Sequence, residues 1–323
     1  MDDRNAEISI CSLVPGATEI LCALGLEPNI IGVSELCNYP ESINTKPIVS
    51  KSRVPTEGYT SSQVETKMRA ILDLGEVPYE IDEYWFKKNQ PDLIVTQDNC
   101  HICEIDVQYI ESRMSSFGYK PEILVIDPKS ISDIYESVRD LARATHTNER
   151  GEMLISDFET RISNILEDLD FRDATKVISI EGVDPLVLGG NWIPEMYRTL
   201  GCNYGVLNPG ASAARIRIEE IIEFNPDFIF VDLCSSSLER QVNEINWLFE
   251  QNGFLNMDAI KNKKLYILNH VFFSTPGPRI VDGMELIANI LSGRTENLPP
   301  SAGLRICNIP PKQVGMNDYV GLV

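Results

Sequence analysis

The 323-residue sequence is acidic, with a formal net charge of -20 and a pI near 4.6, and 43% of its residues are hydrophobic. This charge argues against nucleic acid as a partner, because phosphate binding needs clustered Lys and Arg. No stretch reaches the roughly 20 apolar residues that span a bilayer, so we expect no membrane insertion. The polar residues 1–7 lack the features of a secretory signal. We therefore expect a cytoplasmic protein whose eight cysteines are thiols or metal ligands rather than disulfides.

Short apolar runs alternate with helical patterns along the first part of the chain. This alternation predicts a largely parallel sheet covered by helices. Residues 41–62 resemble a long polar connection. The expected strands are 8–14, 29–33, 91–95 and 122–126, and the expected helices are 18–24, 62–74, 82–89 and 105–117.

Residues 130–169 break this alternation with apolar residues at helical spacing. The pattern begins at Ile131 and Ile134, and it continues after Thr145 to Leu169. At 1.5 Å per residue the tract would span roughly 55–60 Å, which is too long for a crossover helix within one lobe. We therefore predict a rigid helical spine between two lobes.

The pattern of the first lobe repeats after this tract. Strands are expected at 176–180, 227–231 and 264–268, and helices at 194–200, 218–224, 238–250 and 279–291. The predicted fold class is α/β, with two Rossmann-like lobes of mostly parallel sheets and a ligand cleft between them. The predicted parts are an N-terminal lobe at 1–128, an interlobe helix at 129–170, a C-terminal lobe at 171–292 and a peripheral tail at 293–323.

The loops after the strands contain the candidate ligand-binding residues. In an open α/β sheet, ligands bind beyond the carboxyl ends of the strands. Where such a strand leads into a helix, free backbone N–H groups also favour polar ligand groups. The candidates are Pro15, Thr18, Cys37, Tyr39, Gln97, Asp98, Cys100, Glu181, Trp192, Cys234, Phe272 and Arg279.

Cysteines at these loops are candidate metal ligands. Converging thiols could hold zinc or iron tetrahedrally. A C-x-x-C pair is also typical of redox sites, and free cysteines often pack as small hydrophobic residues. The sequence leaves these three alternatives open. The candidate metal ligands are Cys37, Cys100, Cys103 and Cys234, together with His101.

Several segments together resemble the class III substrate-binding proteins of ABC importers, the cobalamin- and siderophore-type family. The resemblance covers about residues 8–292 and implies a two-lobed α/β fold, a ligand between the lobes and little hinge closure. A leaderless cobalamin-binding subgroup is similar in its C-x-x-C loop and in the segment Gly190-Asn-Trp-Ile-Pro-Glu195. An ABC transporter permease is then a candidate partner. The matching segments are 12–25, 31–34, 37–40, 90–94, 191–195, 225–229 and 276–283.

A corrin ring, as the resemblance implies, would suit several of the candidate residues. Its flat apolar faces could stack on Trp192, Tyr39 or Phe272, although core packing is the alternative for aromatic residues. Arg279 could pair with a ligand carboxylate or phosphate, or otherwise with Glu181 or Asp184. His101 and His270 could ligate cobalt or iron through a neutral imidazole nitrogen.

The sequence contains no G-x-S-x-G, H-E-x-x-H, P-loop or G-x-G-x-x-G motif. We therefore predict a non-catalytic cytoplasmic protein that binds a small molecule, either a cobalamin-like corrinoid or an iron chelate. One alternative is a metal-binding enzyme or metallochaperone of the same fold that acts in corrinoid salvage. Another is a thiol redox sensor.

Overall fold

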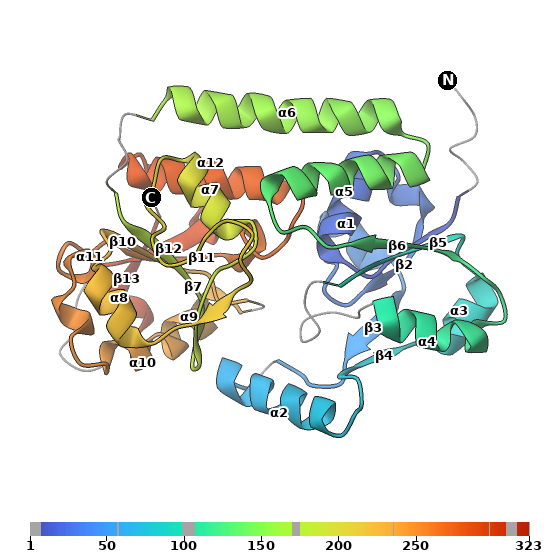
Figure 1. The fold of residues 1–323 in the computed structure, drawn as a ribbon, viewed down its shortest axis with the longest axis horizontal. Coiled ribbons are helices and arrows are strands. Elements are labelled where there is room, and N and C mark those ends of the chain that lie inside the picture. Colours follow the sequence, from blue (N-terminus) through green and yellow to red (C-terminus); the bar gives the residue numbers. More distant parts are fainter. Residues whose placement is uncertain are drawn as a thin grey trace.

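The computed structural model describes residues 8–56, 58–98, 107–169, 175–234, 236–296, 298–307 and 315–322. Over these residues the chain forms two α/β lobes, with a layer of helices running along one side of both (Figure 1). None of the helices in these ranges is long and apolar enough to cross a bilayer. The predicted fold class is confirmed.

The N-terminal lobe contains a six-stranded sheet in the order β4-β3-β2-β1-β5-β6. All neighbouring strands are parallel except β3 and β4. The expected polar connection at 41–62 is wrong in part, because β3 lies within it. The strands are β1 Ile10–Ser12, β2 Ile30–Ser34, β3 Ile48–Ser52, β4 Tyr79–Ile81, β5 Leu93–Gln97 and β6 Glu122–Ile126, and the helices are α1 Pro15–Ala23, α2 Ser61–Asp73, α3 Glu83–Asn89 and α4 Val107–Phe117.

The C-terminal lobe contains a seven-stranded sheet in the order β13-β12-β11-β10-β7-β8-β9. Its central strands β11, β10 and β7 are parallel, and the outer ones pair antiparallel. The expectation of a mostly parallel sheet therefore holds only for the centre of this lobe. The strands are β7 Val177–Val183, β8 Leu186–Leu188, β9 Ala214–Arg215, β10 Phe228–Val231, β11 Leu265–Leu268, β12 Gly303–Ile306 and β13 Tyr319–Gly321.

The helices of the C-terminal lobe flank this sheet, and α12 joins the layer that runs over both lobes (Figure 1). The segment 293–323, expected to be a peripheral tail, instead supplies β12 and β13. Leu304 pairs with Ile267 of β11, so the end of the chain extends the sheet. The helices are α7 Ile193–Thr199, α8 Ile218–Phe224, α9 Leu238–Glu244, α10 Asn246–Phe249, α11 Asp258–Lys261 and α12 Arg279–Leu291.

The helical spine is a hairpin rather than one continuous rod. Helix α5 spans Ile131–Ala144 and α6 spans Asn148–Glu167. His146 between them has a left-handed backbone with φ 57, and Arg139 Nε lies 2.9 Å from Glu152 Oε1, which joins the two helices side by side. The predicted spine of roughly 55–60 Å is therefore wrong, and α6, about 30 Å long, is the helix that runs over both lobes. It packs on α12, while α5 packs on α1 (Figure 1).

The two lobes touch directly where α1 meets the start of α12. A Cβ on Gly16 would lie 2.4 Å from the carbonyl oxygen of Pro276, so the absence of a side chain at Gly16 lets the two backbones approach this closely. A single hydrophobic cluster contains Ala17 of the N-terminal lobe together with Phe273 and Ile280 of the C-terminal lobe. We call this contact, formed by Gly16, Glu19, residues 276–277 and Arg279, the interlobe seam.

We expect Gly16→Ala to destabilise the protein, because the added methyl would meet backbone atoms that cannot rotate away. Overpacking of this kind costs about 1–3 kcal/mol in free energy of unfolding. The matched control is Gly315→Ala, where a Cβ meets nothing within 4 Å and φ is -130. Urea denaturation checks both variants, and equal stability of the two would contradict close lobe contact.

Candidate functional site

A cavity of ≈ 490 Å³ lies between the two lobes. Its N-terminal wall is the segment before α2, and its C-terminal wall is mainly one side of α9. None of the residues predicted from the sequence lines this cavity, although Cys234 lies three residues before its first C-terminal lining residue. The lining residues are Thr56, Gly58, Tyr59, Thr60, Ser237, Glu239, Arg240, Asn243 and Glu244.

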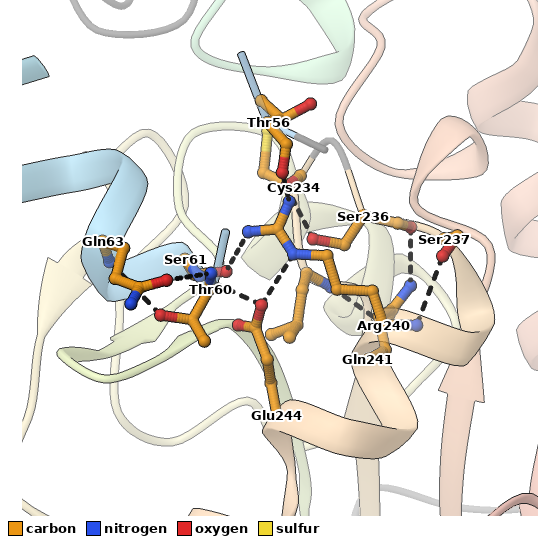
Figure 2. Close-up of polar contacts among 11 residues, drawn as sticks. Thr56, Thr60, Ser61, Gln63, Cys234, Ser236, Ser237, Arg240, Gln241 and Glu244 are labelled. Atoms are coloured by element: carbon orange, nitrogen blue, oxygen red, sulfur yellow. Dashed lines mark hydrogen bonds and ion pairs between the residues drawn. The ribbon is translucent and has the colours of Figure 1, made fainter. Parts of the chain in front are cut away.

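Most residues that line the cavity have polar or charged side chains, and hydrogen bonds hold two of them, Arg240 and Glu244, in place. Arg240 Nε lies 2.7 Å from Glu244 Oε1 within α9. Glu244 Oε1 also accepts a hydrogen bond of 3.0 Å from the backbone N–H of Ser61 in the other lobe (Figure 2). The hydroxyl and amide groups of Thr56, Ser237 and Asn243 can exchange hydrogen bonds with a ligand without charge pairing.

Thr18 and Cys37 meet beneath the carboxyl end of β1, as their places after strand ends suggest. The Thr18 hydroxyl lies 2.8 Å from Ser12 Oγ and 3.1 Å from Cys37 Sγ. Both Thr18 and Cys37 are buried. Their polar atoms therefore bond to one another, and Pro15 forms the first turn of α1 beside them.

Gln97 is buried at the end of β5, and Asp98 after it is exposed. Cys100, His101 and Cys103 lie outside the described residues. Over the rest of the chain, no group of three His, Cys, Asp or Glu residues is placed to hold a metal ion. The metal site that needs the C-x-x-C loop stays a prediction.

Arg279 pairs with Glu19, and the pairing expected with Glu181 or Asp184 is wrong. Its Nε lies 3.0 Å from both carboxylate oxygens of Glu19, and its guanidinium lies 4.5 Å from the ring centroid of Tyr39. Glu19 and Tyr39 belong to the N-terminal lobe, and the interlobe seam brings α12 against α1. The guanidinium therefore bonds across the lobes instead of within its own lobe.

The Glu19–Arg279 pair lies away from water, with side-chain exposures of 2% for Glu19 and 10% for Arg279. Burial raises the pKa of Glu19 to about 7, while the hydrogen bonds from Arg279 oppose the rise. Burial and the nearby Arg279 charge also lower the pKa of His270 to about 4. His270 is thus a neutral imidazole at neutral pH, and its Nδ1 lies 2.8 Å from Ser274 Oγ.

Trp192 is buried, and its indole N–H donates to the carbonyl oxygen of Phe273 at 2.7 Å. This position favours core packing over ligand stacking for the indole ring. Phe272 is half-buried, and Tyr39 is 47% exposed. Of the aromatic candidates, Tyr39 is therefore the most accessible to a ligand.

Glu181, expected in an exit loop, lies within β7, and Cys234 follows β10; the backbone N–H of Cys234 donates to the Glu181 carbonyl at 3.3 Å. Cys234 is exposed and Glu181 is half-buried. Sequence reasoning missed the neighbouring Asp232, although it directly follows the apolar strand β10. Its Oδ1 accepts from Ser179 at 2.6 Å, and its buried Oδ2 has no hydrogen-bond partner in the part of the chain that the structure describes.

Comparison with known proteins identifies the family of this chain. The periplasmic binding protein family matches residues 87–271. A protein of Vibrio vulnificus (strain YJ016) named vitamin B12-binding protein is 24% identical, over 86% of this chain and 88% of its own. A Bacillus subtilis (strain 168) protein named uncharacterized ABC transporter substrate-binding lipoprotein YvrC is 20% identical, over 86% and 78%.

A solved structure shares the fold. The periplasmic heme-binding protein RhuT from Roseiflexus sp. RS-1, in its apo form, superposes with a TM-score of 0.65 and 17% identity, covering 89% of this chain and 98% of its own. The expected cytoplasmic location gains no support from these comparisons, since their printed names describe a lipoprotein and a periplasmic protein.

We expect the Asp232 carboxyl to make stability depend on pH. Burial raises its pKa from 3.8 to about 7, so the folded state binds the proton more tightly than the unfolded state. Its stabilising contribution is present below the unfolded pKa and is lost as the pH rises through about 7. Relative to Asp232→Asn, the wild-type protein should lose on the order of 1–4 kcal/mol between about pH 4 and about pH 8. Urea denaturation across this range measures the difference, and a constant difference would contradict the assignment.

Proposed function

We propose that this chain, which belongs to the periplasmic binding protein family, is of the type that binds vitamin B12 or haem, and that its ligand is a corrinoid held between the two lobes. The observation that carries the proposal is the cavity itself, because its walls come from both lobes. A volume of ≈ 490 Å³ is within the range of about 300–1,000 Å³ that small-molecule sites occupy, so the cavity can receive one edge of a ligand as large as a corrinoid rather than the whole molecule.

The chemistry of the cavity supports a ligand with a hydrogen-bonding edge. A corrin carries amide groups around a flat ring, and amides both donate and accept hydrogen bonds. Thr56, Ser237 and Asn243 offer matching neutral groups on both walls. Tyr39, half exposed on the N-terminal lobe, is a candidate for contact with the ring face.

The partner that follows from this function is an ABC transporter permease, as the name of the Bacillus subtilis relative supports. The domain limits at 128 and 170 are part of the same proposal, since they separate the two walls of the cavity from α5 and α6, whereas the C-terminal lobe extends beyond 292 to β13. The cytoplasmic location stays a prediction, and cell fractionation with an antibody to the chain tests it.

We expect cyanocobalamin to bind the purified protein at 1:1 stoichiometry, as measured by isothermal titration calorimetry, with haemin as the comparison ligand. Asn243→Ala should weaken this affinity by about tenfold, because it removes a side chain that can form hydrogen bonds with the ligand. The matched control is Asn262→Ala, an exposed asparagine after α11, which should bind as the wild-type protein does. No heat from cyanocobalamin would overturn the corrinoid proposal, and tight binding of haemin alone would replace it with a haem ligand.

The metal alternative predicts a different result. If Cys100 and Cys103 hold a metal ion, the protein as purified should contain zinc or iron in a fixed ratio, and Cys100→Ser with Cys103→Ser should abolish it. Elemental analysis by mass spectrometry measures the ratio. A metal-free wild-type protein would exclude this site.

A further inference from the structure

Helix α2 lies apart from the sheet that precedes it in the chain. It follows β3 and lies below both lobes, on the side opposite α6 (Figure 1). Of its 13 residues only Met68 is buried. Helices are held in proteins mainly by packing of an apolar face, so α2 has little of its own to hold it against the N-terminal lobe.

Polar contacts join the start of α2 to the C-terminal lobe instead. Glu244 Oε1 accepts from the Ser61 backbone N–H at 3.0 Å, and Arg240 Nη2 donates to the Ser61 hydroxyl at 3.2 Å. Arg240 Nη1 also donates to the Thr56 carbonyl at 3.4 Å (Figure 2). We call the contacts of Arg240 and Glu244 with Thr56 and Ser61 the latch.

The latch is a favourable arrangement of charge. Ser61 is the first residue of α2, where backbone N–H groups lack partners within the helix and the helix dipole is positive. The carboxylate of Glu244 satisfies one of these groups from the other lobe. With side-chain exposures of 9% for Glu244 and 19% for Arg240, solvent screens the latch only weakly.

A second contact joins α2 to the same lobe nearer its middle. Arg215 of β9 forms an ion pair with Glu65 of α2, which also pairs with Arg69 one turn later at 2.7 Å. The Arg215 side chain is 55% exposed, so this pair adds little stability and weakens with salt.

Access to the cavity then depends on α2. The interlobe seam and the shared hydrophobic cluster hold the two lobes together, so a wide opening of the lobes would break a buried ion pair and a continuous core. The latch residues Thr56, Arg240 and Glu244 themselves line the cavity. Breaking the latch exposes few apolar groups, because α2 buries only Met68. Segments of this kind open most easily in native proteins.

We propose that α2 and the segment 58–60 before it, which lines the interlobe cavity, form a gate, that the latch holds this gate against the C-terminal lobe, and that ligand enters and leaves when the latch opens. The gate rests on the proposed function for the identity of its occupant. The gate also opens in the ligand-free protein, however, so the gate and the identity of the ligand can be tested separately.

Hydrogen–deuterium exchange of the ligand-free protein tests the latch. In Glu244→Ala the amides of α2 should exchange about tenfold faster than in the wild-type protein, while those of α6 and α12 stay unchanged. The matched control is Glu136→Ala, which removes a helical Arg–Glu pair on α5, where Glu136 lies 2.7 Å from Arg139. Unchanged exchange of α2 in Glu244→Ala would overturn the latch.

The exposed pair of Arg215 with Glu65 provides a comparison with the latch. Because this pair adds little stability, Arg215→Ala should speed exchange of α2 less than Glu244→Ala does. Equal or faster exchange of α2 in Arg215→Ala would overturn the latch as the main contact that holds α2.

Stopped-flow binding of cyanocobalamin separates the gate from the function. In Glu244→Ala the association rate should rise by about tenfold. Because Glu244 also lines the cavity, the association rate and not the affinity reports on the gate. Unchanged rates in a variant whose α2 exchanges faster would overturn the gate and leave the binding function intact. Absence of cyanocobalamin binding in every variant would overturn the corrinoid function, and the exchange data would then decide on the latch alone.

Discussion

The buried pair between Glu19 and Arg279 is the constraint on which the arrangement of the lobes depends. Its residues are 260 positions apart and come from the first helix of one lobe and the last helix of the other. Removing one partner of a buried pair leaves an uncompensated charge and typically costs about 3–5 kcal/mol. The contact between Gly16 and Pro276 beside it leaves no room for adjustment. The seam therefore sets the distance between the two sheets, and with it the width of the cavity.

A fixed distance between the lobes changes how such a protein can capture a ligand. A hinge would have to break the seam, separate α6 from α12 and open the shared core, all in one step. On the opposite side of the molecule, polar groups at Thr56, Ser61 and Glu65 join the two lobes over the described residues. The interlobe seam and the shared core thus keep the cavity preformed. The weaker polar contacts lie at α2, the element that moves in the proposed gate. Preformed sites bind with a smaller loss of conformational entropy than sites that assemble on binding.

The apolar and polar pattern of the sequence predicts most helices and strands, but it does not predict where the chain reverses or which strands pair. Strand β6 and helix α8 have the predicted limits, because each is a clear apolar or amphipathic run between polar residues. Strand β3 was missed, since Ile48 is exposed and Lys51 interrupts the apolar run. The reversal between α5 and α6 depends on the left-handed conformation of His146, a residue whose side chain does not demand that conformation. The apolar spacing on both sides of this turn predicts the two helices correctly, but it does not predict the turn between them.

Less of the candidate site than of the fold could be predicted from the sequence. The strand-end rule located Thr18, Cys37 and Cys234 after strands, because it needs only the order of elements along one lobe, whereas Glu181 lies within β7, which is longer than predicted. It could not identify the partner of Arg279 or the cavity wall, since both are formed between lobes. Ser61 and Glu244 are 183 residues apart, and each alone is an ordinary polar residue of a helix. They form a contact only because the seam holds the lobes at one fixed distance. At that distance the carboxylate of Glu244 reaches the free backbone N–H of Ser61 at the start of a helix in the other lobe.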